Sequence, residues 1–202
     1  MFERGVNTKI KEHLEIIPLG KPFTSRSLTF LGTRSAVDKA LSRMAAQGEI
    51  MRLARGIYAK PKPGKFVASI KPSPDEIARA VAETDDYNVR LHGAKALQLL
   101  GLSTQEPMQP VFITDGPTRN IRYGKLNIRL KHVSPGKIPA NLQGKAALAL
   151  TALLYLGKDD VTQDTIRTIR QKLSDQEYLD LLDARQHMPS WLSDLLYKEK
   201  AA

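Results

Sequence analysis

Hydrophobic positions at helical spacing open the chain. Val6, Ile10, Leu14 and Ile17 recur every three or four residues, which is the spacing that places side chains on one face of a helix. A proline and a glycine at residues 18–20 end this pattern. The sequence therefore predicts a first helix with one apolar face, packed beneath the segments that follow.

Two shorter helical patterns follow between residues 24 and 48. Thr24 and Thr33 each precede such a pattern, as N-cap residues do, while Gly32 separates the two and Gly48 ends the second. The second helix is predicted to bury one row of side chains, Val37, Ala40, Leu41 and Met44, and to expose the opposite row, Ser35, Lys39, Ser42 and Arg43.

A compact hairpin pattern comes next. Residues 50–53 alternate between apolar and polar or longer side chains, and residues 56–58 begin with glycine and return as a second short strand. Two short helices followed by such a hairpin have the order of a winged helix-turn-helix, in which the second helix enters the major groove and the basic flanks hold phosphates. The residues expected to contact DNA are Arg26, Thr33, Arg34, Ser35, Lys39, Ser42, Arg43, Arg52, Arg55, Lys60 and Lys62.

The remainder of the chain predicts an α+β arrangement. A proline- and lysine-rich stretch at residues 60–74 indicates a boundary near residue 70, giving a winged-helix domain over 1–70 and a second domain over 71–202. In the second domain helical patterns cover 74–84 and 92–100, short β runs cover 110–114, 119–123 and 125–133, and helical periodicity returns from residue 145 to the end. We expect a small antiparallel sheet followed by a helical C-terminal part.

The charge is concentrated at the N-terminal end. The net charge is +10 over 202 residues. Residues 1–70 hold 13 Lys and Arg against 5 Asp and Glu, whereas residues 71–202 hold 18 against 16. A basic field on the predicted winged-helix domain is expected of a protein that binds double-stranded DNA.

The residue types disfavour an enzyme. The chain has no cysteine, which excludes disulfides, thiolate metal sites and cysteine nucleophiles. Its four histidines are scattered, and the adjacent Asp85 and Asp86 are interpreted as a solvated turn rather than a magnesium site. We therefore expect no catalytic residues, no metal and no cofactor. With no signal-peptide pattern and no apolar run near 20 residues, we expect a cytoplasmic protein with no membrane partner.

A second group of cations lies in the predicted second domain. Its members are Arg90, Lys95, Arg119, Arg122, Arg129 and Lys131. On a strand, Arg129 and Lys131 share one face and Ile128 and Leu130 share the other. Two interpretations stay open: a solvated basic face of an amphipathic sheet, or a contact site for a partner.

Three segments together resemble the AbiEi-type antitoxins and transcriptional regulators of type IV, abortive-infection, toxin-antitoxin systems. GKPFTSRSL with FLGTRSAVDKALSRMAAQGEI is similar to the helix-turn-helix of that family, RLARGIYAKP to its wing, and LHGAKALQLLGLSTQEP to the opening of its C-terminal antitoxin domain. These segments span roughly half the chain, and the wing carries the more specific signature.

The resemblance implies a repressor and antitoxin. It would bind inverted repeats in its own promoter, and it could associate with itself on that DNA. It would also counteract a nucleotidyltransferase-like toxin. Whether it does so by direct contact is left open. The alternative is an interaction module that binds and masks a partner protein, with DNA binding as secondary autoregulation. A nucleic-acid-processing enzyme is disfavoured, because no carboxylate cluster or nucleophile constellation is present.

Overall fold

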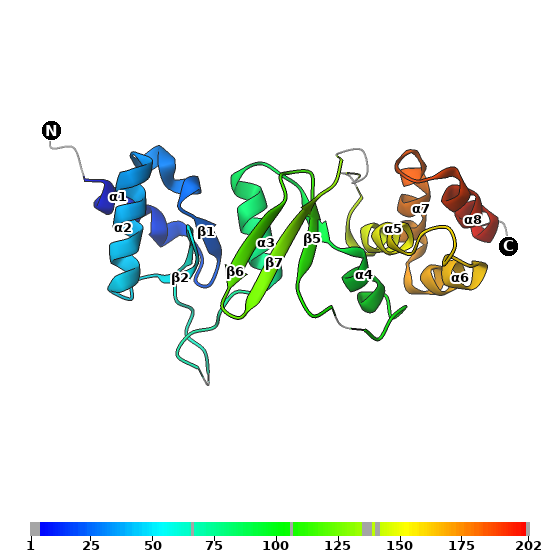
Figure 1. The fold of residues 1–202 in the computed structure, drawn as a ribbon, viewed down its shortest axis with the longest axis horizontal. Coiled ribbons are helices and arrows are strands. Elements are labelled where there is room, and N and C mark those ends of the chain that lie inside the picture. The colour runs from blue at the N-terminus through cyan, green and yellow to red at the C-terminus, as the bar shows by residue number, and fades with distance from the viewer. Residues whose placement is uncertain (1–4, 66, 106, 135–138, 140–141, 201–202) are drawn as a thin grey trace. The chain divides into compact units, whose positions relative to one another are not determined.

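The structure is a computed structural model that describes residues 5–65, 67–105, 107–134, 139 and 142–200. It has a mixed α+β fold with two small sheets (Figure 1). Its contacts divide the chain into two compact units. The first unit contains residues 1–89 and 119–130, and the second contains residues 90–118 and 131–202. Each unit is described by itself below.

Three helical segments and three short strands form the N-terminal part of the first unit. Strand β3 (Ile57–Ala59) lies between β1 (Pro22–Thr24) and β2 (Met51–Ala54), antiparallel to both. A turn at Arg55-Gly56 joins β2 to β3, and Gly56 has a φ of +72°, which is readily adopted by glycine alone. The elements are α1 (Val6–Ile16), β1 (Pro22–Thr24), the 3-10 helix η1 (Arg26–Leu31), α2 (Arg34–Ala46), β2 (Met51–Ala54) and β3 (Ile57–Ala59).

The core of this part is the one that the periodicity predicts. The predicted row of α2 is buried against Ile10 and Leu14 of α1 and Leu28 of η1, together with Phe23 and Tyr58, whose rings stack 6.1 Å apart. Burial of each large apolar side chain contributes about 1.5–3 kcal/mol. These side chains therefore fix the position of α2 relative to α1 and the small sheet.

One of the two predicted helix caps is as expected and the other is shifted. Thr33 is the N-cap of α2, and its side-chain oxygen accepts from the backbone N–H of Ala36 at 3.3 Å. Thr24, however, ends strand β1, and the helix after it is a short 3-10 helix with Ser25 at its N-cap. The hydroxyl of Thr24 still accepts from the N–H of Ser27 at 3.0 Å. It therefore satisfies a backbone donor in the first turn from one position further out.

The first unit continues past residue 70. Helix α3 (Pro74–Thr84) begins with a capping box between Ser73 and Glu76 and contacts β1, where the hydroxyls of Thr24 and Thr84 lie 2.9 Å apart. Strands β6 (Arg119–Tyr123) and β7 (Leu126–His132) form a hairpin, and β6 contacts β2. Its Tyr123 hydroxyl donates to the carbonyl of Pro72 at 2.8 Å.

The compact units therefore differ from the predicted division into 1–70 and 71–202. Helix α3 and the β6–β7 hairpin cluster with the N-terminal elements, because their hydroxyl contacts and packing connect them to β1 and β2. Composition marks the linker at residues 60–74, but composition carries no information on which later segment returns to the first unit.

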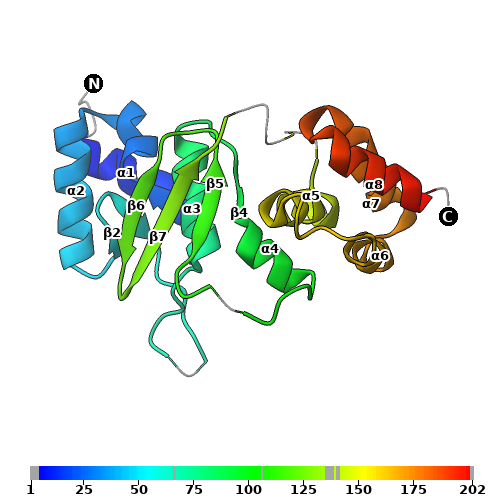
Figure 2. The ribbon, with the colours of Figure 1, turned by 45° about the vertical axis from the view of Figure 1, so that its right-hand side comes forward.

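The second unit is mainly helical (Figure 2). Its helices are α4 (Gly93–Leu99), α5 (Gly144–Leu156), α6 (Gln163–Lys172), α7 (Asp175–Asp183), the 3-10 helix η3 (Ala184–His187) and α8 (Ser190–Lys200). The strands β4 (Val89–Leu91) and β5 (Val111–Thr114) belong to a second sheet in the order β4-β5-β7-β6. This confirms the predicted α+β class with a small sheet and a helical C-terminal part.

Helix α5 is the centre of this unit. Leu150 and Leu153 are buried among side chains of α4, α6, α7 and α8. A Cβ atom placed on Gly93 would lie 2.1 Å from the Cβ of Tyr155, so α4 approaches α5 as closely as a glycine allows. Within the described ranges, no helix combines the length and the apolar character needed to cross a membrane.

Candidate nucleic-acid interface

The exposed face of α2 carries the predicted row of polar and basic side chains. Thr33, Arg34, Ser35, Lys39, Ser42 and Arg43 are all exposed. A shallow surface is lined by the last five of these residues and Asp38. Because the opposite face of the helix is buried in the core, core packing holds this row facing solvent.

Two contacts on α2 orient its basic side chains. The Nε of Arg34 lies 3.0 Å from a carboxylate oxygen of Asp38 one turn later, and the Nε of Arg43 donates weakly to the carbonyl of Lys39 at 3.4 Å. Both arginines are exposed, so the pair with Asp38 contributes only about 0.3–0.5 kcal/mol to stability. Its consequence is that Arg34 is steered along the helix face.

The hairpin of β2 and β3 presents two more exposed arginines. Arg52 is on β2 opposite Tyr58, and Arg55 is in the turn. The pairing shifts register between Arg52 and Ala54, and such an irregularity increases the local twist of a strand. Lys62 is exposed beyond the hairpin. The side chains of all three cations are therefore accessible to solvent.

Lys60 has a different environment from the other predicted DNA contacts. Its Nζ donates to the carbonyl of Leu14 in the last turn of α1 at 2.8 Å. A cation at a helix C-terminus satisfies an unpaired carbonyl and interacts favourably with the helix dipole. We therefore assign Lys60 a structural role, which leaves its charge less available for DNA.

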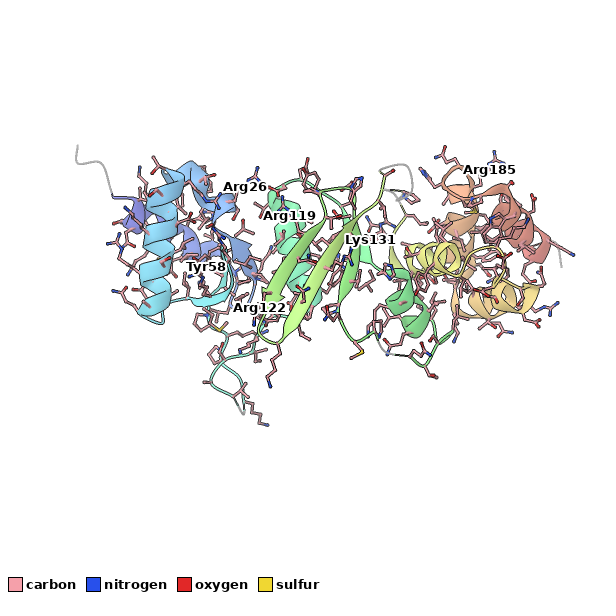
Figure 3. All side chains as sticks on the ribbon, viewed as in Figure 1. Arg26, Tyr58, Arg119, Arg122, Lys131 and Arg185 are labelled. Carbon is pink, nitrogen blue, oxygen red and sulfur yellow. The ribbon has the colours of Figure 1, made fainter. Side chains whose placement is uncertain are left out.

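Arg26 and Arg119 form ion pairs with the same carboxylate. Figure 3 labels both arginines. Asp85, at the C-terminal end of α3, lies 2.8 Å from Arg26 Nη1 through Oδ1 and 2.7 Å from Arg119 Nη2 through Oδ2. Its side chain is only 5 % exposed. The interpretation of Asp85 as part of a solvated turn is therefore wrong for this residue, because two arginines from distant segments cover it.

The β6–β7 hairpin separates its cations between two faces. Arg119 lies opposite Leu130 on the buried face, whereas Arg122 lies opposite Asn127 and Asn120 opposite Arg129 on the exposed face. The predicted alternation of Arg129 and Lys131 against Ile128 and Leu130 is confirmed by the burial of the two apolar residues. Arg122 and Arg129, with the two asparagines, form an exposed polar face that we call the hairpin face.

The six predicted partner contacts are divided between the two compact units. Arg119, Arg122 and Arg129 belong to the first unit, and Arg90, Lys95 and Lys131 belong to the second. Arg90 and Lys131 line a cavity. Lys95, on α4, donates to Gln98 one turn later.

Asp85 is a residue of this surface whose pairing the sequence interpretation missed. Its two arginine partners are 59 and 34 residues away along the chain, so no local pattern connects them. The available signal was the position of an acid directly after a predicted helix. An acid is unfavourable at a helix C-terminus, and this disadvantage indicates a compensating cation elsewhere. Over the described residues, no group of three or more His, Cys, Asp or Glu is arranged to hold a metal ion.

Comparison with known proteins assigns the chain to a family. No curated protein matches the chain. A family model described as a family of unknown function, DUF6088, matches residues 9–181. That match runs from within α1 to within α7 and includes the α2 face, the hairpin face and Asp85. The chain belongs to the DUF6088 family.

Proposed function

We propose that the protein is a DNA-binding transcriptional repressor whose N-terminal elements form a winged helix-turn-helix. In this proposal α2 is the recognition helix and the β2–β3 hairpin is the wing. The observation that carries the proposal is the exposed row on α2, from Thr33 to Arg43, opposite a fully buried apolar row. Such a helix can enter a major groove while its core contacts stay intact.

The position of the hairpin cations supports the same assignment. Arg52 and Arg55 are exposed on a short antiparallel hairpin directly after α2, where a wing would contact phosphates. Phosphate contacts give affinity and orientation, whereas contacts to base edges give specificity. We therefore assign positioning to the hairpin and reading to the N-terminal half of α2.

We further propose that the protein acts in the cytoplasm as the antitoxin of a toxin-antitoxin operon. It would repress its own promoter at inverted repeats and counteract a nucleotidyltransferase-like toxin. This part rests on the sequence resemblance to AbiEi-type antitoxins. The hairpin face, with Arg122, Arg129 and two asparagines exposed, favours the second candidate function, a module that binds and masks a partner protein directly.

The DNA proposal is tested with the full chain and duplex DNA from its own upstream region. The double variant Lys39→Gln with Arg43→Gln should lose at least about tenfold in affinity, because two charges on the recognition face are removed. The control is Lys158→Gln with Arg185→Gln, which removes two exposed charges from the second unit. Equal losses in both variants, measured by fluorescence anisotropy, would exclude α2 as the DNA-contacting helix.

A separate assay distinguishes the two antitoxin mechanisms. The protein and the toxin encoded beside it are expressed from unrelated inducible promoters, so that autoregulation has no effect on toxin level. If the hairpin face binds a partner, Arg122→Glu with Arg129→Glu should reduce growth rescue while the α2 double variant rescues normally. Normal rescue by the hairpin variant, with a confirmed fold, would exclude the masking role of this face.

A further inference from the structure

A cavity of about 190 Å³ lies in the second unit. Its apolar wall comes mainly from α5, with Ile113 of β5. Its polar wall contains Arg90 of β4, His92, Lys131 of β7 and Tyr155 of α5. An enclosed apolar cavity of about 150 Å³ is large enough to hold benzene. The cavity here can therefore hold a single ring or a short branched chain with one small polar group.

The charge of this cavity is one-sided. Among the residues that the structure describes, its lining includes two cations, Arg90 and Lys131, and no carboxylate. Within the part of the chain that the structure describes, neither cation forms an ion pair. Arg90 donates one of its N–H groups to the backbone carbonyl of Pro139. Since a guanidinium has five N–H donors, the others remain for an anion.

Burial makes this cation costly unless an anion is bound. Desolvation lowers the pKa of Arg90 below its usual value, although an arginine stays charged at neutral pH. A half-buried guanidinium without a carboxylate partner is unusual in a folded protein, because a buried charge is normally paired. An anionic ligand would supply the missing partner.

An aromatic pair forms another part of the wall. The rings of His92 and Tyr155 meet edge to face with centroids 5.0 Å apart. Burial, together with the charge of Lys131, lowers the pKa of His92, so this imidazole is neutral at pH 7. It therefore offers a flat surface and a hydrogen-bonding nitrogen rather than a third positive charge.

We propose that the second unit binds a small organic monocarboxylate with a ring or branched apolar body, held in this cavity. Arg90 and Lys131 bind the carboxylate, while Leu150, Leu154 and the Tyr155 side chain contact the apolar body. The proposal is independent of the DNA-binding and antitoxin functions. It adds a ligand site to a unit for which the resemblance implies only a protein-level role.

Sodium benzoate is the probe, added to the full chain and followed by saturation-transfer NMR and calorimetry. Benzamide is its neutral isostere and inorganic phosphate is an anion without an apolar body. We expect benzoate to bind at least about tenfold more tightly than benzamide, because a charge-assisted hydrogen bond is about twice as strong as a neutral one. We expect phosphate at the same concentration not to displace benzoate.

Two variants locate the site. Lys131→Gln, an exposed position on β7, should weaken benzoate binding about tenfold, whereas the matched exposed control Lys158→Gln should bind like the wild type. Thr151→Leu places a larger side chain in the wall of the cavity and should also weaken binding, with circular dichroism confirming that it folds.

Three results would each overturn the proposal. They are the absence of benzoate binding at millimolar concentration, unchanged binding in Lys131→Gln, and equal binding of benzoate and benzamide. Displacement of benzoate by an equal concentration of phosphate would also overturn it, because it would show a general anion site with no use for the apolar wall. None of these measurements involves DNA or the toxin, so they leave the proposed function untouched.

Discussion

Asp85 shows how one residue can organise three segments. It receives Arg26 from η1 and Arg119 from β6 at the end of α3. Two guanidinium groups neutralise one buried carboxylate and leave a net positive charge, which is carried mainly by Arg26, 62 % exposed. Arg26 therefore retains some capacity for a phosphate, but its side chain is already held in place by a protein group.

Arg119→Gln should destabilise the first unit by about 1–3 kcal/mol, because a buried charged acceptor loses one of its two partners. Arg122→Gln, on the exposed face of the same strand, should change the free energy of unfolding by no more than about 0.5 kcal/mol. Urea unfolding followed by circular dichroism measures both. If the two variants lose equal stability, the ion pair with Asp85 contributes nothing.

Arg34 is the residue for which we predict base reading. Arg34→Ala should cost about 1–3 kcal/mol on the operator and little on random duplex DNA, since a bidentate contact to a guanine is lost only at the specific site. Arg55→Ala in the turn of the hairpin should weaken both duplexes alike. Anisotropy titrations with matched operator and scrambled DNA test this. Equal losses on the two duplexes for Arg34→Ala would show that it only positions the protein.

Tyr178 gives a prediction at high pH. Its hydroxyl donates to the carbonyl of Leu196 at 2.7 Å, and burial, reinforced by Glu199 and opposed by Arg170, raises its pKa to about 12. The folded state therefore holds this proton more tightly than the unfolded state, whose tyrosine ionises near pH 10. The stability should fall as the pH rises from about 10 to 12.

This titration can be followed by the ultraviolet absorbance of tyrosinate in the wild type and in Tyr178→Phe. The difference between the two curves should show a step well above pH 10. Tyr178→Phe should also reduce the free energy of unfolding by about 0.5–1.5 kcal/mol at pH 7, because one hydrogen bond is lost. A difference step at pH 10 would show that the phenol is not desolvated.

At the scale of elements, the spacing of apolar residues was sufficient to predict the position of helices and strands that bury one face. The helices α1, α2, α3 and α5 and the hairpin strands β6 and β7 lie where the apolar spacing predicts them. Strand β1 was missed, because three buried residues after a lysine carry no alternation that distinguishes a strand from a loop. The apolar spacing also does not distinguish the 3-10 form of η1, in which Leu28 is buried, from an α-helix.

The candidate site likewise has one part that local sequence predicts and another that depends on contacts between distant segments. The exposed row of α2 could be predicted, since it is the complement of a buried row on the same helix. The pairing of Asp85 with Arg26 and Arg119 could not, because it joins segments that are distant in the sequence. The structural role of Lys60 was hidden for the same reason, as its acceptor Leu14 is on α1.

The contact between α4 and α5 makes Gly93 sensitive to substitution. Gly93→Ala would place a methyl group 2.1 Å from the Cβ of Tyr155, and the helices must separate to accept it. We expect a loss of about 1–3 kcal/mol, as for other overpacked sites. Trp191, packed against the core of the same unit, provides a fluorescence signal for denaturant unfolding.

Thr104→Ala is the control for this substitution, because Thr104 is exposed in the loop after α4. It should alter the free energy of unfolding by no more than about 0.5 kcal/mol. A Gly93→Ala protein as stable as this control would mean that α4 and α5 move apart without cost, and that the close approach is not needed for folding.

At the scale of the whole molecule, a domain boundary drawn at the linker near residue 70 and one drawn from the compact units would give different fragments. A cut at residue 70 would remove α3 and the β6–β7 hairpin from the first unit and expose the surface of β1 that contacts α3. Fragment 1–70 should therefore be less stable than the same residues in the full chain. Tests of DNA binding and of antitoxin action are better made with substitutions in the full chain.

The distribution of charge predicts how DNA binding depends on salt. Residues 1–70 carry 13 Lys and Arg against 5 Asp and Glu, and each phosphate contact releases counterions, so the logarithm of the binding constant should fall steeply with the logarithm of salt concentration. If the hairpin of β2 and β3 contacts phosphates, Arg52→Gln with Arg55→Gln should reduce this slope by about 2.

Lys158→Gln with Arg185→Gln removes the same charge from exposed positions of the second unit and should leave the slope unchanged, because counterion release depends on contact rather than on net charge. Equal changes in the two variants, measured on random duplex at several salt concentrations, would show that the hairpin acts only through the overall field and is not a wing.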